Sequence, residues 1–165
     1  MLEGFICVIA VMVSLATGQI MLEERDQNKP VNTVYRQTTF EGNTKMIELV
    51  SLDNNFDIDA PIGRHGATAL HIAAHNGDLT TMAFLLERFA DPNVMMKGRK
   101  RPIHLAVDHP DRQKAYKMCH MLLEAGANPN VMTSRGSGWH WPVERAMHHG
   151  DKKLADLIFS YYPTN

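Results

Sequence analysis

The sequence predicts an all-α protein built of stacked helix-pair units. A short pattern around His71 recurs around His104, and the two histidines are 104 − 71 = 33 residues apart. The end of the unit recurs as well, since residues 85–93 match residues 122–130. Within each unit apolar residues recur at spacings of three or four, which is typical of the buried stripe of a helix. Together these observations favour a repeat in which each unit folds as two packed helices.

Length and composition indicate one folded domain. The chain has 165 residues, of which 44% are hydrophobic and 21% charged, and this excludes a wholly disordered chain. The 17 Lys and Arg residues nearly balance the 18 Asp and Glu residues, for a formal net charge of −1. No nucleic-acid partner is therefore expected, because such proteins usually carry a basic domain. With two cysteines, Cys7 and Cys119, the chain has no disulfide framework.

The N-terminus is apolar. Residues 4–22 carry no charged side chain, and residues 5–16 are almost wholly apolar. Small residues before Gln19 suit cleavage of a secretory signal at residues 1–18, but the charged residue that precedes the apolar run is Glu3 and not a basic residue. The run is also nearly long enough to span a bilayer. A cleaved signal, a membrane anchor at residues 4–22 and a buried or poorly ordered extension are therefore all open.

A polar segment separates this N-terminus from the repeats. Residues 23–32 contain a proline and show no periodicity, which predicts a linker. We divide the chain into an N-terminal segment, residues 1–34, and a repeat domain, residues 35–165. The repeat domain is predicted to hold about four units, at residues 35–60, 61–93, 94–130 and 131–165. The outer two match the pattern poorly and are expected to act as caps, because the end faces of a solenoid meet water.

The last three units predict three helix pairs. The expected pairs are residues 70–77 with 80–89, 103–109 with 112–125, and 143–149 with 152–161. Gly126 suits the left-handed end of a helix, and Phe89 occupies the same place in the preceding unit. A strained or differently built turn is therefore expected at Phe89.

Two insertions distinguish the later units. In the third unit the leucine pair begins 18 positions after the histidine, against 14 in the second, and we place the four extra residues around residues 109–114. The last hairpin gains three residues around residues 133–138, beside Trp139 and Trp141. Insertions in repeat stacks map to loops, often on the binding face. Both segments are therefore predicted to be surface loops.

The repeated motif resembles the ankyrin repeat family, whose unit is 33 residues long. The residues that carry the resemblance are 68–74 (TALHIAA), Gly77, Leu85, Leu86 and 90–93 (ADPN). The resemblance implies an ankyrin repeat solenoid whose two outer units are degenerate caps. It also implies that His71 and His104 make hydrogen bonds that hold adjacent repeats together. Arg101 stands where the family has threonine, so the hairpin before His104 is expected to depart from the usual form.

A finer resemblance is to the inhibitor-of-NF-κB branch of the family, and within it to the truncated viral ankyrins of insect polydnaviruses, the vankyrin type. It covers about residues 40–160 and rests on the lengthened third unit, the extended last hairpin and residues 102–108 (PIHLAVD) and 126–131 (GANPNV). It implies a protein that holds a host Rel/NF-κB transcription factor inactive in the cytoplasm or nucleus and so suppresses host immunity. The chain has no Asp-Ser-Gly phosphodegron, so phosphorylation of that signal would not release such an inhibitor. The alternatives are a secreted or membrane-anchored ankyrin binder and a cytosolic adaptor for another partner.

Stacks of this kind bind proteins through hairpin tips and inner-helix positions. The candidate contacts on the inner helices are His75, Asn76, Asp108, His109, His148 and His149. The candidate contacts at the tips are Arg64, His65, Met96, Lys97, Arg99, Arg135, Trp139 and Trp141. Aromatic and arginine side chains are the residues that most often dominate binding. The basic tip at residues 97–101 is either a solvated tip or a partner contact, and Met95 and Met96 are either adaptable contact surface or hairpin packing.

No catalytic, cofactor or metal site is predicted. The chain contains no GxSxG, HExxH, GxGxxG or GxxxxGK[ST] motif. His71 and His75 have a spacing that suits zinc, but no set of Cys and His ligands surrounds them, so packing explains them better. Cys119 beside His120 suggests a nucleophile, yet adjacent helical residues point about 100° apart. We therefore expect a protein-binding module that is not an enzyme and has no small-molecule substrate.

Overall fold

The computed structural model describes residues 57–133 and 141–163, together with residues 36, 38, 39, 41, 42 and 44. The predicted N-terminal segment, residues 1–34, lies outside the described residues, as does most of the first predicted unit. So does the greater part of the predicted last hairpin, including Arg135 and Trp139.

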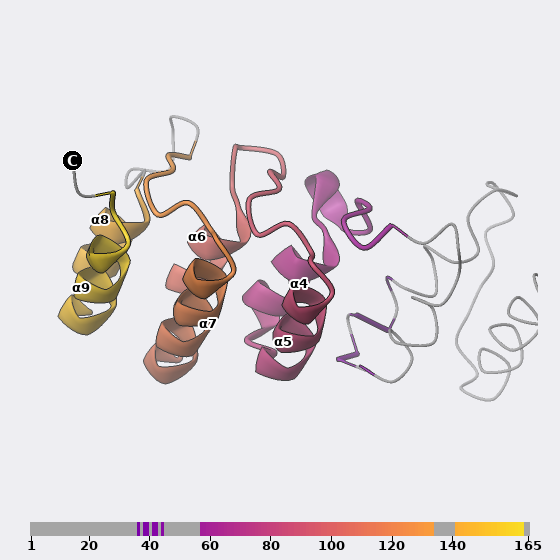
Figure 1. Ribbon diagram of the computed structural model, residues 1–165, viewed down its shortest axis with the longest axis horizontal. Helices are drawn as coiled ribbons and strands as arrows, with labels where there is room; N and C mark the ends of the chain where they lie inside the picture. The colour runs from indigo at the N-terminus through magenta and orange to yellow at the C-terminus, as the bar shows by residue number, and fades with distance from the viewer. Residues whose placement is uncertain are drawn as a thin grey trace, which may run out of the picture.

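Three helix pairs stand side by side in chain order over the described residues (Figure 1). They are α4 (Ala69–Asn76) with α5 (Leu79–Glu87), α6 (Pro102–Val107) with α7 (Arg112–Glu124), and α8 (Pro142–His148) with α9 (Lys152–Ser160). A short 3-10 helix, η1 (Arg64–Gly66), precedes them. No strand occurs among these residues; a single bridge joins Met96 and Lys100. The all-α prediction is confirmed, and each predicted helix starts within one residue, and ends within two, of its observed bounds.

The second helix of each pair begins at an aspartate. Asp78 accepts hydrogen bonds from the backbone N–H groups of Thr80 and Thr81. Asp111 and Asp151 cap α7 and α9 in the same way. An aspartate in this position satisfies N–H groups that have no partner within the helix. All three outer helices therefore start at the same place in their units.

The four extra residues of the third unit lengthen α7. This helix has 13 residues, whereas α5 has nine, and both begin directly after their capping aspartate. Four residues make roughly one turn of 3.6 residues, so the buried stripe keeps its direction after the insertion. The prediction that they form a surface loop around residues 109–114 was wrong.

The core lies between two layers of helices. The inner helices α4, α6 and α8 pack on one another in sequence, as do the outer helices α5, α7 and α9, and each inner helix packs on its own outer helix. The largest fully buried side chains come from both layers and include Leu70, Leu85, Ile103, Leu122 and Ile158. Each such side chain contributes about 1.5–3 kcal/mol of hydrophobic stabilisation. The units therefore share one continuous core.

The turn after α5 is strained, as predicted. Phe89 has a φ of 61°, in the left-handed region, and its side chain is 91% exposed. At the same place in the next unit Gly126 has a φ of 88°. A β-carbon disfavours this conformation, so Phe89 holds a backbone shape that suits glycine better.

None of the helices in the described ranges is long and apolar enough to cross a membrane.

Candidate protein-binding surface

Two buried histidines tie each hairpin to its neighbour. In His71, Nδ1 lies 2.9 Å from the hydroxyl of Thr68 and Nε2 lies 3.3 Å from the carbonyl oxygen of Lys100 in the next unit. His104 repeats this arrangement: its Nδ1 accepts the N–H of Arg101 at 3.1 Å, and its Nε2 lies 3.2 Å from the carbonyl oxygen of Val131. The role that the resemblance implied for these two histidines is confirmed.

Both rings are held neutral by burial. The pKa of His104 is lowered from 6.5 to about 4, mainly by desolvation and also by the nearby charges of Arg145 and Arg101, against the hydrogen bonds to Val131 and Arg101. Desolvation also lowers the pKa of His71. A neutral ring can accept at Nδ1 and donate from Nε2, which is what these contacts require. The two histidines are therefore structural residues.

The last pair departs from this pattern. Glu144 replaces the histidine, and its Oε2 accepts the N–H of Trp141 at 3.4 Å. A carboxylate has no N–H to donate across the boundary to another hairpin. Trp141, expected at a hairpin tip, is the N-cap residue of α8 and is half-buried.

The tips of the second and third units are joined by their backbones. The N–H of Lys97 donates to the carbonyl oxygen of His65 at 2.8 Å. Arg64, His65, Lys97 and Arg99 are all exposed, so this bond brings together the predicted tip residues of the two units. Figure 1 shows η1 and the 93–101 loop as neighbours at one end of the helices.

The hairpin of the third unit also orients its methionines. Met96 is half-buried, and its N–H donates to the carbonyl oxygen of Lys100 at 2.9 Å. Met95, the neighbouring residue for which contact surface and hairpin packing were both open, is 52% exposed. The guanidinium of Arg101 turns back and donates from Nε to the carbonyl oxygen of Asn93 at 3.0 Å. Arg101 therefore braces the hairpin in place of the threonine expected from the family.

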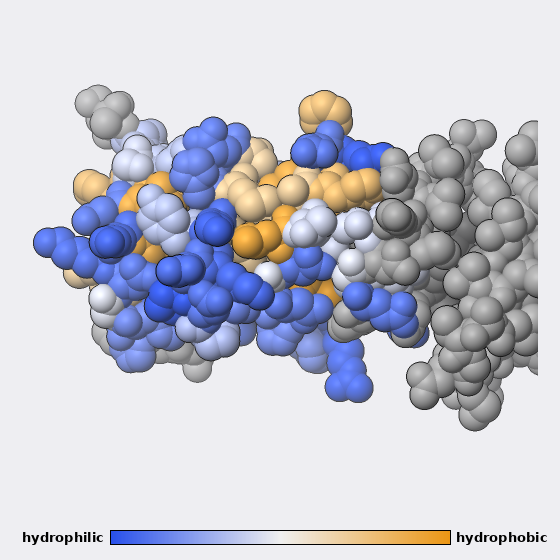
Figure 2. Space-filling model, turned by 90° about the horizontal axis from the view of Figure 1, so that it is seen from below, coloured by the Kyte–Doolittle hydropathy of each residue, from blue (hydrophilic) through white to orange (hydrophobic). Residues whose placement is uncertain are grey.

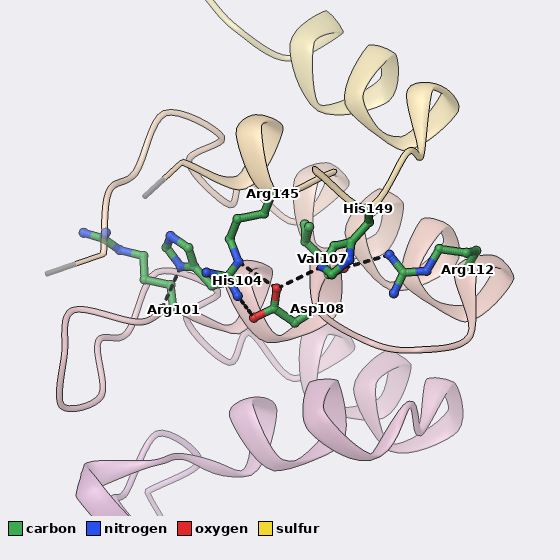
Figure 3. Close-up of polar contacts among 7 residues, drawn as sticks. All are labelled: Arg101, His104, Val107, Asp108, Arg112, Arg145 and His149. Atoms are coloured by element: carbon green, nitrogen blue, oxygen red, sulfur yellow. Dashed lines mark hydrogen bonds and ion pairs between the residues drawn. The ribbon is translucent and has the colours of Figure 1, made fainter. Parts of the chain in front are cut away.

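At the ends of the inner helices, Asp108 is engaged by the next unit (Figure 3). Arg145 donates from Nε to Oδ1 of Asp108 at 2.7 Å and from its terminal nitrogen to Oδ2, while Nε2 of His149 lies 3.5 Å from Oδ1. The side chains of Arg145 and Asp108 are only 15% and 27% exposed. Asp108, a predicted contact, is thus bound by His149, another predicted contact, and by Arg145, which was not among the predicted residues. The available signal was a pair of opposite charges on consecutive inner helices.

The other inner-helix candidates divide into two kinds. His109 is half-buried against Gly77: a β-carbon on Gly77 would lie 2.4 Å from its Nε2, so His109 is a packing residue. His75, Asn76 and His148 are exposed at the ends of α4 and α8. The side chains of all three are exposed to solvent.

A groove on the outer layer was not foreseen. It has a volume of about 960 Å³ and runs between α7 and α9. Its lining residues are Arg112, Gln113, Tyr116, Lys117, Asp151, Lys153, Asp156, Leu157 and Ser160. Figure 2 shows the molecule from below, with the C-terminal helix pairs at the left, as in Figure 1. The described surface of these pairs is mostly hydrophilic in this view. The groove is open to solvent, and most of the residues that line it are charged or polar.

The described residues offer binding surfaces and little reactive chemistry. Cys119 is fully buried, and burial raises the pKa of its thiol, which disfavours the nucleophilic thiolate. Within the described ranges no three His, Cys, Asp or Glu side chains are grouped so that they could hold a metal ion.

Comparison with known proteins identifies the repeat. The family model described as ankyrin repeats (3 copies) matches residues 36–133, more than half of the 165 residues. Ankyrin repeat domain-containing protein 53 of Macaca fascicularis is 32% identical over 93 residues, 56% of this chain and 18% of that protein. Rabankyrin-5 of Mus musculus is 35% identical over 88 residues, 48% of this chain and 7% of that protein. A putative ankyrin repeat protein of Rickettsia bellii is 27% identical over 113 residues, 67% of this chain and 31% of that protein. This chain thus spans less than a third of each of these relatives.

Proposed function

Because this chain belongs to the ankyrin repeat family, whose repeats are protein-binding units, we propose that its hairpin tips and inner-helix ends bind a Rel/NF-κB transcription factor and hold it inactive. The proposal has two parts, a binding surface and a partner, and each has its own support.

The hydrogen bond between Lys97 and His65 carries the first part. This hydrogen bond joins two hairpin tips whose exposed side chains do not belong to the core. The core can therefore support both tips rigidly. The exposed inner-helix ends at His75, Asn76 and His148 extend the same surface. Preorganised surfaces of this kind favour binding because little conformational freedom is lost when a partner docks. In this proposal the module acts by binding alone, without catalysis.

The second part rests on resemblance. Residues 102–108 and 126–131, and the lengthened third unit, resemble the inhibitor-of-NF-κB branch, and the 13-residue α7 agrees with that lengthening. Within that branch the chain resembles the viral ankyrins of polydnaviruses. The proposed role is therefore suppression of host immune signalling. The proposed location is the cytoplasm or nucleus of the host cell. The sequence contains no Asp-Ser-Gly phosphodegron. Phosphorylation that releases inhibitors carrying this signal would therefore leave the proposed complex intact.

A direct binding measurement tests the proposal. The full chain is titrated with a purified Rel-homology domain by calorimetry, beside a variant in which His75 and Asn76 are both alanine. In the control variant Gln113 and Lys117 are likewise both alanine. These two residues are exposed on α7 in the outer layer. We expect micromolar or tighter binding, weakened about tenfold or more by the inner-helix change and little by the control. No binding at about 10 µM would reject the Rel/NF-κB partner, and equal losses in the two variants would reject this surface.

The apolar residues 4–22 favour the second candidate, a secreted or membrane-anchored ankyrin binder. Mass spectrometry of the mature N-terminus in the natural host cell separates the two. A new terminus near residue 19 would support secretion, whereas an intact N-terminus in the soluble cell fraction would support the intracellular inhibitor.

A further inference from the structure

The two joined hairpin tips carry charge of one sign. Residues 61–67 and 94–101 contain Arg64, Lys97, Arg99, Lys100 and Arg101 and no aspartate or glutamate. The whole chain has a formal net charge of −1, so the rest of it carries −1 − 5 = −6. Positive charge is therefore concentrated on two adjacent tips of an otherwise acidic molecule.

The tip backbones hold this charge in place. His65 has a φ of 62° and Arg99 a φ of 58°, both in the left-handed region that side-chain-bearing residues disfavour. The bonds from Lys97 to His65 and from Met96 to Lys100 keep the two tips in these conformations. Strained backbone held by its surroundings is typical of binding sites. The points at which these side chains leave the backbone are therefore fixed before a ligand binds.

The hairpin of the third unit also carries an exposed apolar side chain, that of Met95. Met95 is 52% exposed, and methionine adapts its flexible side chain to different apolar contacts. Arginine suits carboxylates in particular, because its planar guanidinium can donate two parallel hydrogen bonds to one carboxylate. The surface thus combines carboxylate donors with an adaptable apolar contact.

We propose that this cationic tip surface, formed by Arg64, His65, Met95, Lys97 and Arg99, binds an acidic protein segment that carries an apolar side chain among its carboxylates. The inference rests on the proposed function, since it takes protein binding as given and adds the chemistry of the partner. Nucleic acid fits less well. Binding a phosphate backbone calls for a basic stripe along the molecule, and outside the two tips the charge balance is acidic.

A peptide titration with two charge-reversed variants tests the proposal. The probe is a labelled peptide of alternating Asp and Glu with one central Leu, and binding to the full chain is followed by fluorescence anisotropy. The tip variant is Lys97→Glu with Arg99→Glu. The control, Lys152→Glu with Lys153→Glu, makes the same change in net charge on exposed positions of α9. Thermal melts check that both variants remain folded.

The wild-type chain should bind the acidic peptide. It should not bind a peptide in which Lys replaces every Asp and Glu. The tip variant should lose at least about tenfold in affinity and the control less than about twofold, because the local and not the overall charge attracts the peptide. Raising the ionic strength from about 0.01 M to about 0.15 M should weaken the wild-type complex. Equal losses in the two variants, or no binding by the wild type, would overturn the proposal. Tighter binding of duplex DNA than of the peptide would replace it with a nucleic-acid site.

The same variants separate this inference from the proposed function. A Rel-homology domain that binds the wild type and the tip variant equally, while the acidic peptide binds neither, would overturn the acidic-segment proposal and leave the Rel/NF-κB partner in place. Binding of the acidic peptide without binding of the Rel-homology domain would support the inference and reject that partner.

Discussion

The Nε2 atom of His104 lies 3.2 Å from the carbonyl oxygen of Val131, across the boundary between two repeats. The Nδ1 atom of the same ring accepts the N–H of Arg101 at 3.1 Å. A neutral imidazole with its proton on Nε2 satisfies both contacts, whereas a protonated ring would turn a second N–H toward the N–H of Arg101. The stability of this boundary therefore depends on His104 remaining neutral.

Stability should fall as the pH falls from about 6.5 toward about 4. The pKa of His104 is lowered from 6.5 to about 4 in the folded protein, so over this range the unfolded chain binds more protons. The free energy of unfolding then decreases as the solution becomes more acidic, by at most about 3 kcal/mol for this group. Urea unfolding at about pH 7 and about pH 4.5 measures the loss. His104→Gln should reduce it and His75→Gln, at an exposed position, should not; an unchanged loss in His104→Gln would contradict the assignment.

Phe89→Gly should stabilise the protein. The φ of 61° at Phe89 costs a side-chain-bearing residue roughly 1–2 kcal/mol, and its side chain, 91% exposed, contributes little packing. We expect a gain of about 1 kcal/mol in the free energy of unfolding. Phe89→Ala keeps the β-carbon and should change little.

Gly126→Ala is the opposite substitution at the same turn of the next unit, because it adds a β-carbon. Gly126 has a φ of 88° and nothing lies within 4 Å of a β-carbon built there, so any loss comes from the backbone. The expected loss is about 1 kcal/mol. A stabilised Gly126→Ala or a destabilised Phe89→Gly would show that the turn is not the source of strain.

Asp59→Asn should also stabilise the stack. Asp59 accepts the N–H of Asp91 at 3.1 Å, as Asn93 accepts the N–H of Asn128 at 2.8 Å in the next unit. Asn93 in addition donates from Nδ2 to the carbonyl oxygen of Gly126 at 3.0 Å, which an ionised aspartate cannot do. The added bond should contribute about 0.5–1.5 kcal/mol at neutral pH.

The stability gained from Asp59→Asn should be smaller at acidic pH than at neutral pH. Desolvation raises the pKa of Asp59, and the charges of Asp91 and Asp57 add to the rise, against the hydrogen bond from Asp91. An ionised Asp59 therefore costs stability above its folded pKa, and protonation removes that cost as the pH falls. Thermal melts at about pH 7 and about pH 3.5 compare the two conditions. Asn93→Asp should lower stability at neutral pH, and a gain that is equal at both pH values would contradict the electrostatic part.

Asp108 and Arg145 should be energetically coupled. Arg145 donates two hydrogen bonds to the carboxylate of Asp108, and the side chains are only 15% and 27% exposed. A double-mutant cycle with Asp108→Ala and Arg145→Ala should give a coupling of about 1–2 kcal/mol, above the typical exposed pair. Arg145→Lys should recover only part of it, since lysine lacks the planar pair of donors. A coupling near zero would mean that the contact does not persist in solution.

The sequence was sufficient for features that depend on neighbours a few residues apart. Apolar residues at helical spacing on either side of His71 and His104 predicted the helix pairs, because such stripes are buried wherever the units stack. The strained turn at Phe89 was predictable from the glycine at the same place in the next unit, because the left-handed conformation is a property of the local backbone. The first unit, the capping role of the first and last units, and the tip residues Arg135 and Trp139 remain predictions.

The tertiary structure decided what depends on the stacking of one unit on another. Four extra residues are compatible with a loop or with one more helical turn, and only the packed structure placed them in α7, where a whole turn preserves the buried stripe. The same holds for Asp108, which looked available to a partner until Arg145, 37 residues later, was found against it. The sequence alone determined the repeat and its helices because local spacing specifies them; which polar side chains meet across unit boundaries follows from the rotation and separation of successive units, which no local spacing records.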